Sequence, residues 1–284
     1  LCLRIKEIIM ILKNKTLKEK IVTILNYYKV KNYNKLIEEA KKILKKKPNI
    51  DLLWNAIGLS YQQKGELDKA EKNFLTCLQV NPENMSAINN LGNNYKYLFN
   101  YSKAEECFER VLKKNPKYLV ALVNYGNLKF ELNKFSESLE LLEKAYNLDS
   151  NSISVKLNLA LVYQSIGEYE KALNHLKEIN TLNPTVVRAD KMISALINYN
   201  ENNEHLHVMD KKLKELTLEN DQKVYLHFAL GKAYEDQENY QKAMEHIELG
   251  NQLKMRSSEY NLDREKALFK NIKDLFINYD FNKH

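Results

Sequence analysis

The chain has 284 residues, of which 44% are hydrophobic and 29% are charged, and this composition excludes an intrinsically disordered protein. Only seven glycines and four prolines are present, which disfavours a β-sandwich with many tight turns and favours helices joined by short connections. The net charge of +7 is concentrated near the start, because residues 1–50 contain 14 Lys and Arg against 4 acidic residues.

Residues 1–16 are predicted to form an N-terminal extension or helix. Their apolar run, Ile8 to Leu12, has only five residues and no signal-peptide cleavage pattern, so no membrane contact is expected. Three cysteines without a CxxC pair favour a reducing compartment, and we predict a cytoplasmic protein. The basic segment "KKILKKKP" at 41–48 is interpreted as a solvated helix face, with binding of nucleic acid, acidic lipid or an acidic protein as the alternative.

A period of 34 residues organises the chain from residue 17 to residue 186. In a frame that begins at Asp51, apolar or aromatic residues recur at positions 4, 7, 11 and 24, small residues at positions 8 and 20, and proline at position 32. The frame predicts five units without an insertion: 17–50, 51–84, 85–118, 119–152 and 153–186. The second unit shows the pattern as Trp54, Ile57, Gly58, Tyr61, Ala70, Phe74, Cys77 and Pro82.

Each unit is predicted to be two amphipathic helices, because its apolar residues recur at helical spacing. The small residues let the two helices approach closely, and the proline ends the second helix. One pair cannot bury its apolar face alone, so the units are expected to stack. The pattern resembles the tetratricopeptide repeat. That resemblance implies an all-α fold, a right-handed superhelix (an α-solenoid of antiparallel helix pairs), whose concave face binds proteins or peptides.

Glycine and proline are almost fully accounted for by the repeat. All four prolines stand at position 32, and five of the seven glycines stand at position 8 or 15 of these units. No GxxxxGK[ST], GxGxxG or GxSxG motif is present, so we predict no catalytic residue and no cofactor in this chain. His205 and His207 are two residues apart on a predicted helix, where their side chains diverge, so no metal site is expected.

The repeat signature fades after residue 186 and then returns. Residues 187–223 keep helical spacing and are predicted to be a degenerate helix pair, whereas residues 224–257 form another unit. Met255 replaces the proline of that unit, so its second helix is expected to run on. Residues 258–284 are predicted to be a capping or linker helix that covers the end of the stack with Leu262, Ala267, Leu268, Ile272, Leu275 and Phe276.

The segments "LHFALGKAYEDQENYQKAMEHIELGNQLK" and "YNLDREKALFKNIKDLF" carry a second resemblance. They are similar to the region that joins a tetratricopeptide array to a sulfotransferase domain in bacterial fusion proteins. The resemblance implies a parent enzyme that uses the sulfonate donor PAPS and whose catalytic domain lies outside this chain. None of that family's catalytic motif is present here, so whether the protein is an enzyme stays open.

Asparagines recur every 34 residues at two positions of the first helix: Asn90, Asn124 and Asn158 at position 6, and Asn93 and Asn127 at position 9. An amide side chain both donates and accepts, so a row of amides can bind the backbone of an extended peptide whatever its sequence. Such rows resemble those in the repeats of O-GlcNAc transferases. Some three-repeat domains hold a terminal carboxylate with a lysine at position 5, but that position here is Asn55, Asn89, Val123 and Leu157.

The sequence therefore predicts a protein-interaction scaffold that binds an extended peptide or a partner domain in its concave groove. The alternative is the substrate-recruiting N-terminal region of a PAPS-dependent sulfotransferase. Nucleic acid is not an expected partner, because tyrosines one full repeat apart are too distant to stack on successive bases.

Overall fold

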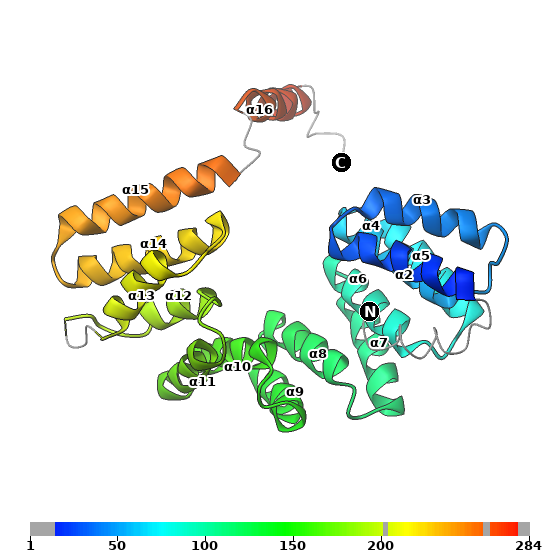
Figure 1. The fold of residues 1–284 in the computed structure, drawn as a ribbon, viewed down its shortest axis with the longest axis horizontal. Helices are drawn as coiled ribbons and strands as arrows, with labels where there is room; N and C mark the ends of the chain where they lie inside the picture. Colours follow the sequence, from blue (N-terminus) through cyan, green and yellow to red (C-terminus); the bar gives the residue numbers. More distant parts are fainter. Residues whose placement is uncertain (1–14, 201–203, 258–261, 278–284) are drawn as a thin grey trace. The chain divides into compact units, whose positions relative to one another are not determined.

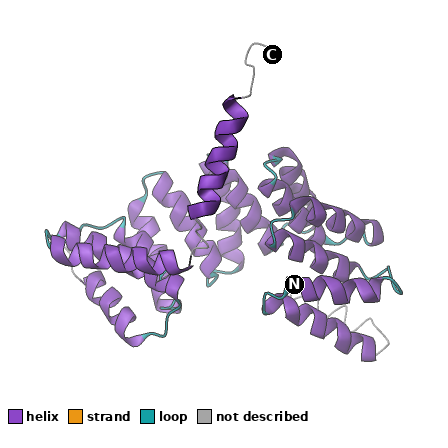
Figure 2. Cartoon of the chain, turned by 90° about the horizontal axis from the view of Figure 1, so that it is seen from above, coloured by secondary structure: helices purple, strands orange, loops and turns teal. Residues whose placement is uncertain are grey.

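The computed structural model describes residues 15–200, 204–257 and 262–277, and every regular element in these ranges is an α-helix (Figures 1 and 2). The prediction of an all-α fold is therefore confirmed. The helices are α2 (Lys15–Lys29), α3 (Tyr33–Leu44), α4 (Asp51–Gln63), α5 (Leu67–Val80), α6 (Met85–Tyr97), α7 (Tyr101–Lys114), α8 (Leu119–Glu131), α9 (Phe135–Leu148), α10 (Ile153–Ser165), α11 (Tyr169–Leu182), α12 (Arg188–Ser194), α13 (Glu204–Glu215), α14 (Asn220–Asp236), α15 (Tyr240–Ser257) and α16 (Leu262–Ile277).

The chain divides into two compact units, with the boundary between Gly167 and Glu168. In the first unit, a helix A and a helix B alternate, and each helix B packs against the helix A before it and the one after it. The helices A also contact one another from α4 through α6 and α8 to α10 (Figure 1). These four helices start at Asp51, Met85, Leu119 and Ile153, so the helical period equals the 34-residue period of the sequence.

Close contact between helix A and helix B depends on glycine at position 8. A Cβ atom placed on Gly58 would lie 2.6 Å from the ring of Phe74, and one on Gly92 would lie 2.9 Å from the ring of Phe108. Both phenylalanines, at position 24, are fully buried. The glycine therefore makes room for the largest side chain in the core of each pair.

The turn between helix A and helix B has the same backbone conformation in all six recognisable units. Position 15 adopts a positive φ at Gly65 and Gly167 (75° and 83°). The other four units adopt a φ of 57–58° there with residues other than glycine: Lys31, Phe99, Asn133 and Glu238. A left-handed residue costs an L-amino acid roughly 1–2 kcal/mol, so the packing of the two helices imposes this conformation on side chains that disfavour it.

The second unit departs from the regular pattern at the predicted degenerate pair. Residues 187–223 are predicted to be a degenerate helix pair, and the first helix of this segment, α12, has only seven residues and ends at Ser194. Tyr199 is fully buried, and its backbone N–H donates to Asp236. This anchoring of the chain outside a helix explains the short α12. Both α12 and α13 pack against α14, which itself begins at Asn220, one turn before the predicted unit.

The last two helices confirm one expectation and correct another. Helix α15 has 18 residues and runs past Met255, as the missing proline predicted. In α16, Leu268 is 50% exposed and Ile272 is 40% exposed, and Ala267 is also exposed. These three side chains therefore do not cover the stack. The side chains of Leu262, Leu275 and Phe276, like residues 1–14 of the predicted extension, lie outside what the structure describes. None of the described helices is long and apolar enough to cross a membrane.

Replacing Gly92 with leucine should lower the free energy of unfolding by roughly 1–3 kcal/mol, because the side chain would enter the space of Phe108 and Cys107. Urea denaturation followed by circular dichroism measures the loss. Gly92→Ala, which adds only the Cβ atom, should lie between the wild type and Gly92→Leu. Equal stability of all three proteins would contradict the contact between position 8 and position 24.

Candidate functional site

The predicted asparagine rows lie on three neighbouring helices A of the first unit. Asn90 and Asn93 belong to α6, Asn124 and Asn127 to α8, and Asn158 to α10. All five side chains are half-buried. Because α6 contacts α8 and α8 contacts α10, the rows run across adjoining helices, and we call this surface the asparagine face.

Two asparagines of the position-6 row bind the repeat before them. The Nδ2 atom of Asn90 donates to Oδ1 of Asn55 at 3.0 Å, and Nδ2 of Asn124 donates to Oδ1 of Asn89 at 3.1 Å. Asn55 and Asn89, at position 5, are buried. The expected row of outward-facing amides is thus partly a row of bonds between successive helices A, and these two bonds hold the repeats in register.

Asn158 ends this chain of bonds. The position-5 residue before it is Val123, whose side chain cannot accept a hydrogen bond. The amides of Asn93, Asn127 and Asn158 form no hydrogen bond with the described residues, so each keeps its donor and acceptor for another molecule. Within the described residues, these three amides are the unbonded members of the two predicted rows.

Charged groups near the asparagine face are neutralised within the protein. The Lys96 ammonium on α6 lies 2.6 Å from Oε1 of Glu131 on α8. Lys129 stands where other repeats have tyrosine, lies 2.7 Å from both Glu105 and Glu137, and is buried. Neither of these two lysines is therefore free to bind a terminal carboxylate, in line with the absent position-5 lysine.

Apolar side chains flank the free amides. Tyr97 on α6 is 53% exposed and Val120 on α8 is 49% exposed. Leu157 and Leu161 on α10 are half-buried. A ligand on this surface would thus meet amides at helical intervals with apolar contacts beside them.

Two of the position-11 tyrosines donate to carboxylates of the helix B before them, whereas Tyr61 at the same position accepts from Lys41 of α3, and the 34-residue signature predicts neither contact. The hydroxyl of Tyr95 donates to Glu71 at 2.9 Å, and that of Tyr163 donates to Glu143 at 3.1 Å. Tyr125, at position 7, makes the same bond with Glu109, and burial together with this carboxylate raises the pKa of its hydroxyl to about 12. The acidic residues stand at position 21 or 25, which vary too much for a 34-residue signature.

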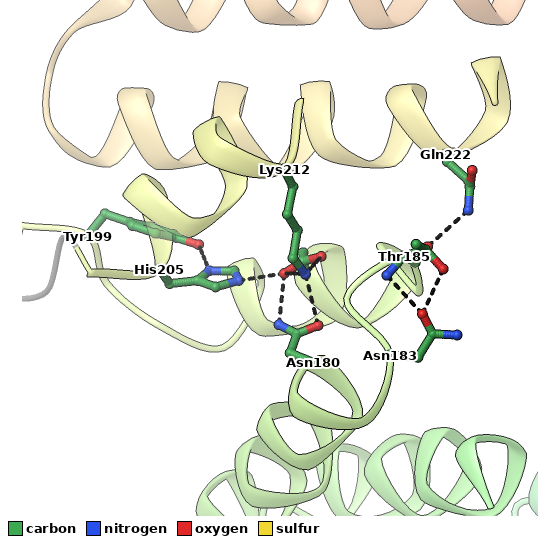
Figure 3. A network of polar contacts seen from close by, with 8 residues as sticks. Asn180, Asn183, Thr185, Tyr199, His205, Lys212 and Gln222 are labelled. Carbon is green, nitrogen blue, oxygen red and sulfur yellow. Dashed lines mark hydrogen bonds and ion pairs between the residues drawn. The ribbon is translucent and has the colours of Figure 1, made fainter. Parts of the chain in front are cut away.

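A buried polar network holds the irregular part of the second unit together (Figure 3). The Asp190 carboxylate on α12 is fully buried and lies 2.7 Å from the ammonium of Lys212 on α13. It also accepts from Asn180 of α11 at 2.8 Å. His205 lies 3.1 Å from the same carboxylate and 2.7 Å from the Tyr199 hydroxyl. The network joins three helices and the segment after α12.

The two histidines of the "HLH" segment have separate surroundings. His205 is inside this network with a side chain that is 12% exposed, whereas His207 is exposed. Within the described residues, no three His, Cys, Asp or Glu side chains are grouped so that they could hold a metal ion. Of these two histidines, only His205 belongs to the buried network. The two-residue spacing in the sequence does not predict this difference.

A second histidine pair joins α14 to α15. The Nδ1 atoms of His227 and His246 lie 3.0 Å apart, and the ring of His246 stacks on Tyr234. Burial lowers the pKa of both imidazoles, and the charge of His246 lowers the pKa of His227 further. A hydrogen bond between the two Nδ1 atoms needs one of them to accept, so at least one ring must be neutral, and the lowered pKa values favour the neutral form.

Comparison with known protein families adds to this geometry. The family model of the tetratricopeptide repeat matches residues 52–84 and 224–254. These two segments are therefore similar to tetratricopeptide repeats. A model described as anaphase-promoting complex, cyclosome, subunit 3 matches residues 98–179. The two tetratricopeptide matches include the unit that follows the irregular segment.

Several solved structures share the fold of this chain. A tetratricopeptide repeat protein from Parabacteroides merdae has a TM-score of 0.60 at 18% identity, over 90% of this chain and 98% of its own. Pseudomonas aeruginosa pilF has a TM-score of 0.57 at 20% identity, over 78% of this chain and 97% of its own. A thermophilic tetratricopeptide protein of Thermus thermophilus has a TM-score of 0.52 at 21% identity, over 63% and 98%. At these identities the likeness shows the fold alone.

No curated protein matches the sequence. The resemblance of the C-terminal part to the linker of sulfotransferase fusions is not shown by these comparisons and stays a prediction. The tetratricopeptide repeats themselves are supported by both the family models and the solved structures.

Removing the Lys212 ammonium should be strongly destabilising, because it leaves the buried Asp190 carboxylate without its counter-ion. We expect Lys212→Met to lower the free energy of unfolding by about 3–5 kcal/mol. The double variant Asp190→Leu with Lys212→Met removes both charges and should recover most of that loss. Chemical denaturation followed by circular dichroism compares the two. A single variant as stable as the wild type would show that the ion pair is not required.

Acid should weaken the contact between α14 and α15 through the histidine pair. Since the folded pKa values of His227 and His246 lie below the ordinary 6.5, the unfolded chain binds more protons as the pH falls below 6.5. The stabilising contribution is therefore present above pH 6.5 and is lost as the pH falls through the folded values. Hydrogen exchange of α14 and α15 between pH 7.5 and 5.0, corrected for intrinsic rates, measures it. The double variant His227→Gln with His246→Gln should lose this pH dependence, and His207→Gln should keep it.

Proposed function

We propose that this protein is a protein-interaction scaffold whose asparagine face binds an extended peptide segment. The observation that carries the proposal is the set of free amides of Asn93, Asn127 and Asn158 on adjoining helices A. Each amide can accept from one backbone N–H and donate to one backbone carbonyl of a peptide. Backbone recognition of this kind gives affinity that does not depend on the peptide's side chains.

The surroundings of these amides support an internal peptide segment as the ligand. A C-terminal carboxylate or a phosphorylated side chain needs a free cation, but Lys96 and Lys129 are already paired with glutamates. The exposed Tyr97 and Val120 instead offer contact area to apolar side chains. The face thus suits an uncharged stretch of a partner protein.

The sulfotransferase alternative concerns what this chain belongs to. If a catalytic domain follows in the parent protein, the asparagine face would recruit that enzyme's protein substrate. No feature of the described structure favours this alternative over a free-standing scaffold. The cytoplasmic location and the absence of a nucleic-acid partner likewise stay predictions.

The free and the bonded asparagines should respond differently to alanine substitution. Asn93, Asn127 and Asn158 changed together to alanine should weaken peptide binding about tenfold or more, with little change in stability, because each loses hydrogen bonds to the ligand only. Asn90→Ala with Asn124→Ala should instead lower stability by about 1–2 kcal/mol, because two bonds between repeats are lost.

A peptide selected on the wild-type protein from a displayed library of random twelve-residue sequences serves as the probe, and calorimetry measures its affinity. Asn147→Ala with Asn151→Ala, on exposed positions in α9 and in the turn that follows it, is the control outside α6, α8 and α10. If the triple variant bound the selected peptide as tightly as the wild type does, the proposal would be overturned.

A further inference from the structure

The basic segment that precedes Pro48 borders a cleft at the start of the first unit. A hollow of about 850 Å³ opens between α2 and α3. Its apolar lining includes Ile24, Tyr27 and Ile43, and five lysines with two glutamates complete most of the rest: Lys20, Lys42, Lys45, Lys46, Lys47, Glu19 and Glu39. The cleft therefore combines an apolar lining with an excess of positive charge, and neither the asparagine face nor the repeat core uses it.

Most of these lysines have no counter-ion in the protein. Lys42 lies 2.6 Å from Glu38 and 2.8 Å from Glu39, so its charge is satisfied. Lys20 and Lys45–Lys47 are exposed and form no ion pair with any described residue. Four uncompensated cations around one hollow attract an anionic partner.

The other repeats show which groups of a preceding helix B bind this surface of a helix A. At position 11, Tyr95 donates to Glu71 and Tyr163 donates to Glu143, each on the preceding helix B, whereas Tyr61 accepts from Lys41 of α3. Tyr27 stands at position 11 of the first repeat, residues 17–50, and lines the cleft. No described helix precedes α2, and the Tyr27 hydroxyl has no hydrogen bond within the described chain.

We infer that this cleft is a second docking site, which binds an acidic amphipathic helix of a partner protein in the place of a preceding helix B. The apolar side of that helix lies on Ile24 and Ile43. One carboxylate accepts from the Tyr27 hydroxyl, as Glu71 and Glu143 do for their tyrosines. Further carboxylates pair with the lysines of the rim.

The cleft suits a partner protein that binds reversibly better than a further repeat packed permanently against α2. Positions 3 and 7 of the next unit are Leu53 and Ile57, which are fully buried. The same positions in the first repeat, residues 17–50, are Glu19 and Thr23, which are exposed. Less apolar area is thus available than between two repeats, so affinity depends more on charge.

Two other occupants fit less well. Residues 1–14 contain Arg4, Lys6 and Lys13 against Glu7, so their charge has the same sign as the rim. A nucleic acid needs cations along its backbone and aromatic faces for its bases, whereas these lysines surround an apolar hollow. The hydroxyl of Tyr27 at the carboxylate-binding position favours an acidic helix over both.

The chain supplies a rational probe in its own α9, an acidic helix B whose Glu143 binds Tyr163. A fluorescently labelled, end-capped peptide of residues 135–148 is titrated with the full-length protein, and fluorescence anisotropy measures binding. We expect saturable binding that is lost when the peptide carries Glu137→Gln, Glu140→Gln and Glu143→Gln. Tyr27→Phe should weaken it about tenfold, since one hydrogen bond to a carboxylate is removed.

Matched variants separate the cleft from general charge. Lys46→Glu with Lys47→Glu should abolish binding of the peptide, whereas Lys113→Glu with Lys117→Glu on exposed positions of the first unit changes the net charge equally and should not. Tyr28→Phe, beside Tyr27 but not among the residues that line the cleft, controls for loss of a hydroxyl on α2. The triple asparagine variant should bind the α9 peptide normally, which separates this site from the asparagine face.

Four results would overturn the inference. The α9 peptide could fail to bind the wild-type protein. It could also bind Tyr27→Phe and the double variant of Lys46 and Lys47 as tightly as it binds the wild type. It could bind only after residues 1–14 are deleted, which would make the chain's own segment the occupant. A twelve-nucleotide single-stranded RNA could bind the cleft more tightly than the peptide, with no effect of Tyr27→Phe, which would make nucleic acid the ligand.

Discussion

The contact between a glycine and a large side chain, repeated every 34 residues, is the constraint from which the rest of the first unit follows. Gly58 against Phe74 and Gly92 against Phe108 set how closely helix A approaches helix B. Once that separation is set, each pair presents one apolar surface to the next pair, and the helices A come into contact with one another. The asparagine face exists because the glycines bring successive helices A to a constant spacing.

The sequence predicts the features that this contact repeats in every unit, and it does not predict the features that occur only once. Helix period, core residues and the positions of the asparagines follow from a 34-residue frame, because each is set by contacts that recur in every unit. The buried pair of Asp190 and Lys212 occurs once, between residues 22 positions apart in a segment without the frame. Only the folded chain brings these two charges together, so no periodic signal announces them.

The asparagine rows show the same division within a single motif. The frame places Asn90, Asn124 and Asn158 at equivalent positions, yet only the first two bind the preceding repeat. The difference is a neighbour, since position 5 changes from asparagine to Val123. Equivalent positions therefore carry different tasks, and a side chain's task depends on two repeats read together. The tyrosines of position 11 follow the same principle, because their partners lie on the helix before them.

Val123 also bears on the problem of alignment that any repetitive binding surface faces. A ligand held by identical groups at equal intervals can shift by one interval and make the same bonds, so a uniform row does not define where the ligand starts. One interruption removes that translational equivalence. The amide of Asn158, which has no asparagine before it, differs from Asn90 and Asn124 in what it leaves unbonded. For a peptide lying across α6, α8 and α10, that single valine distinguishes one end of the surface from the other and gives the bound chain a direction.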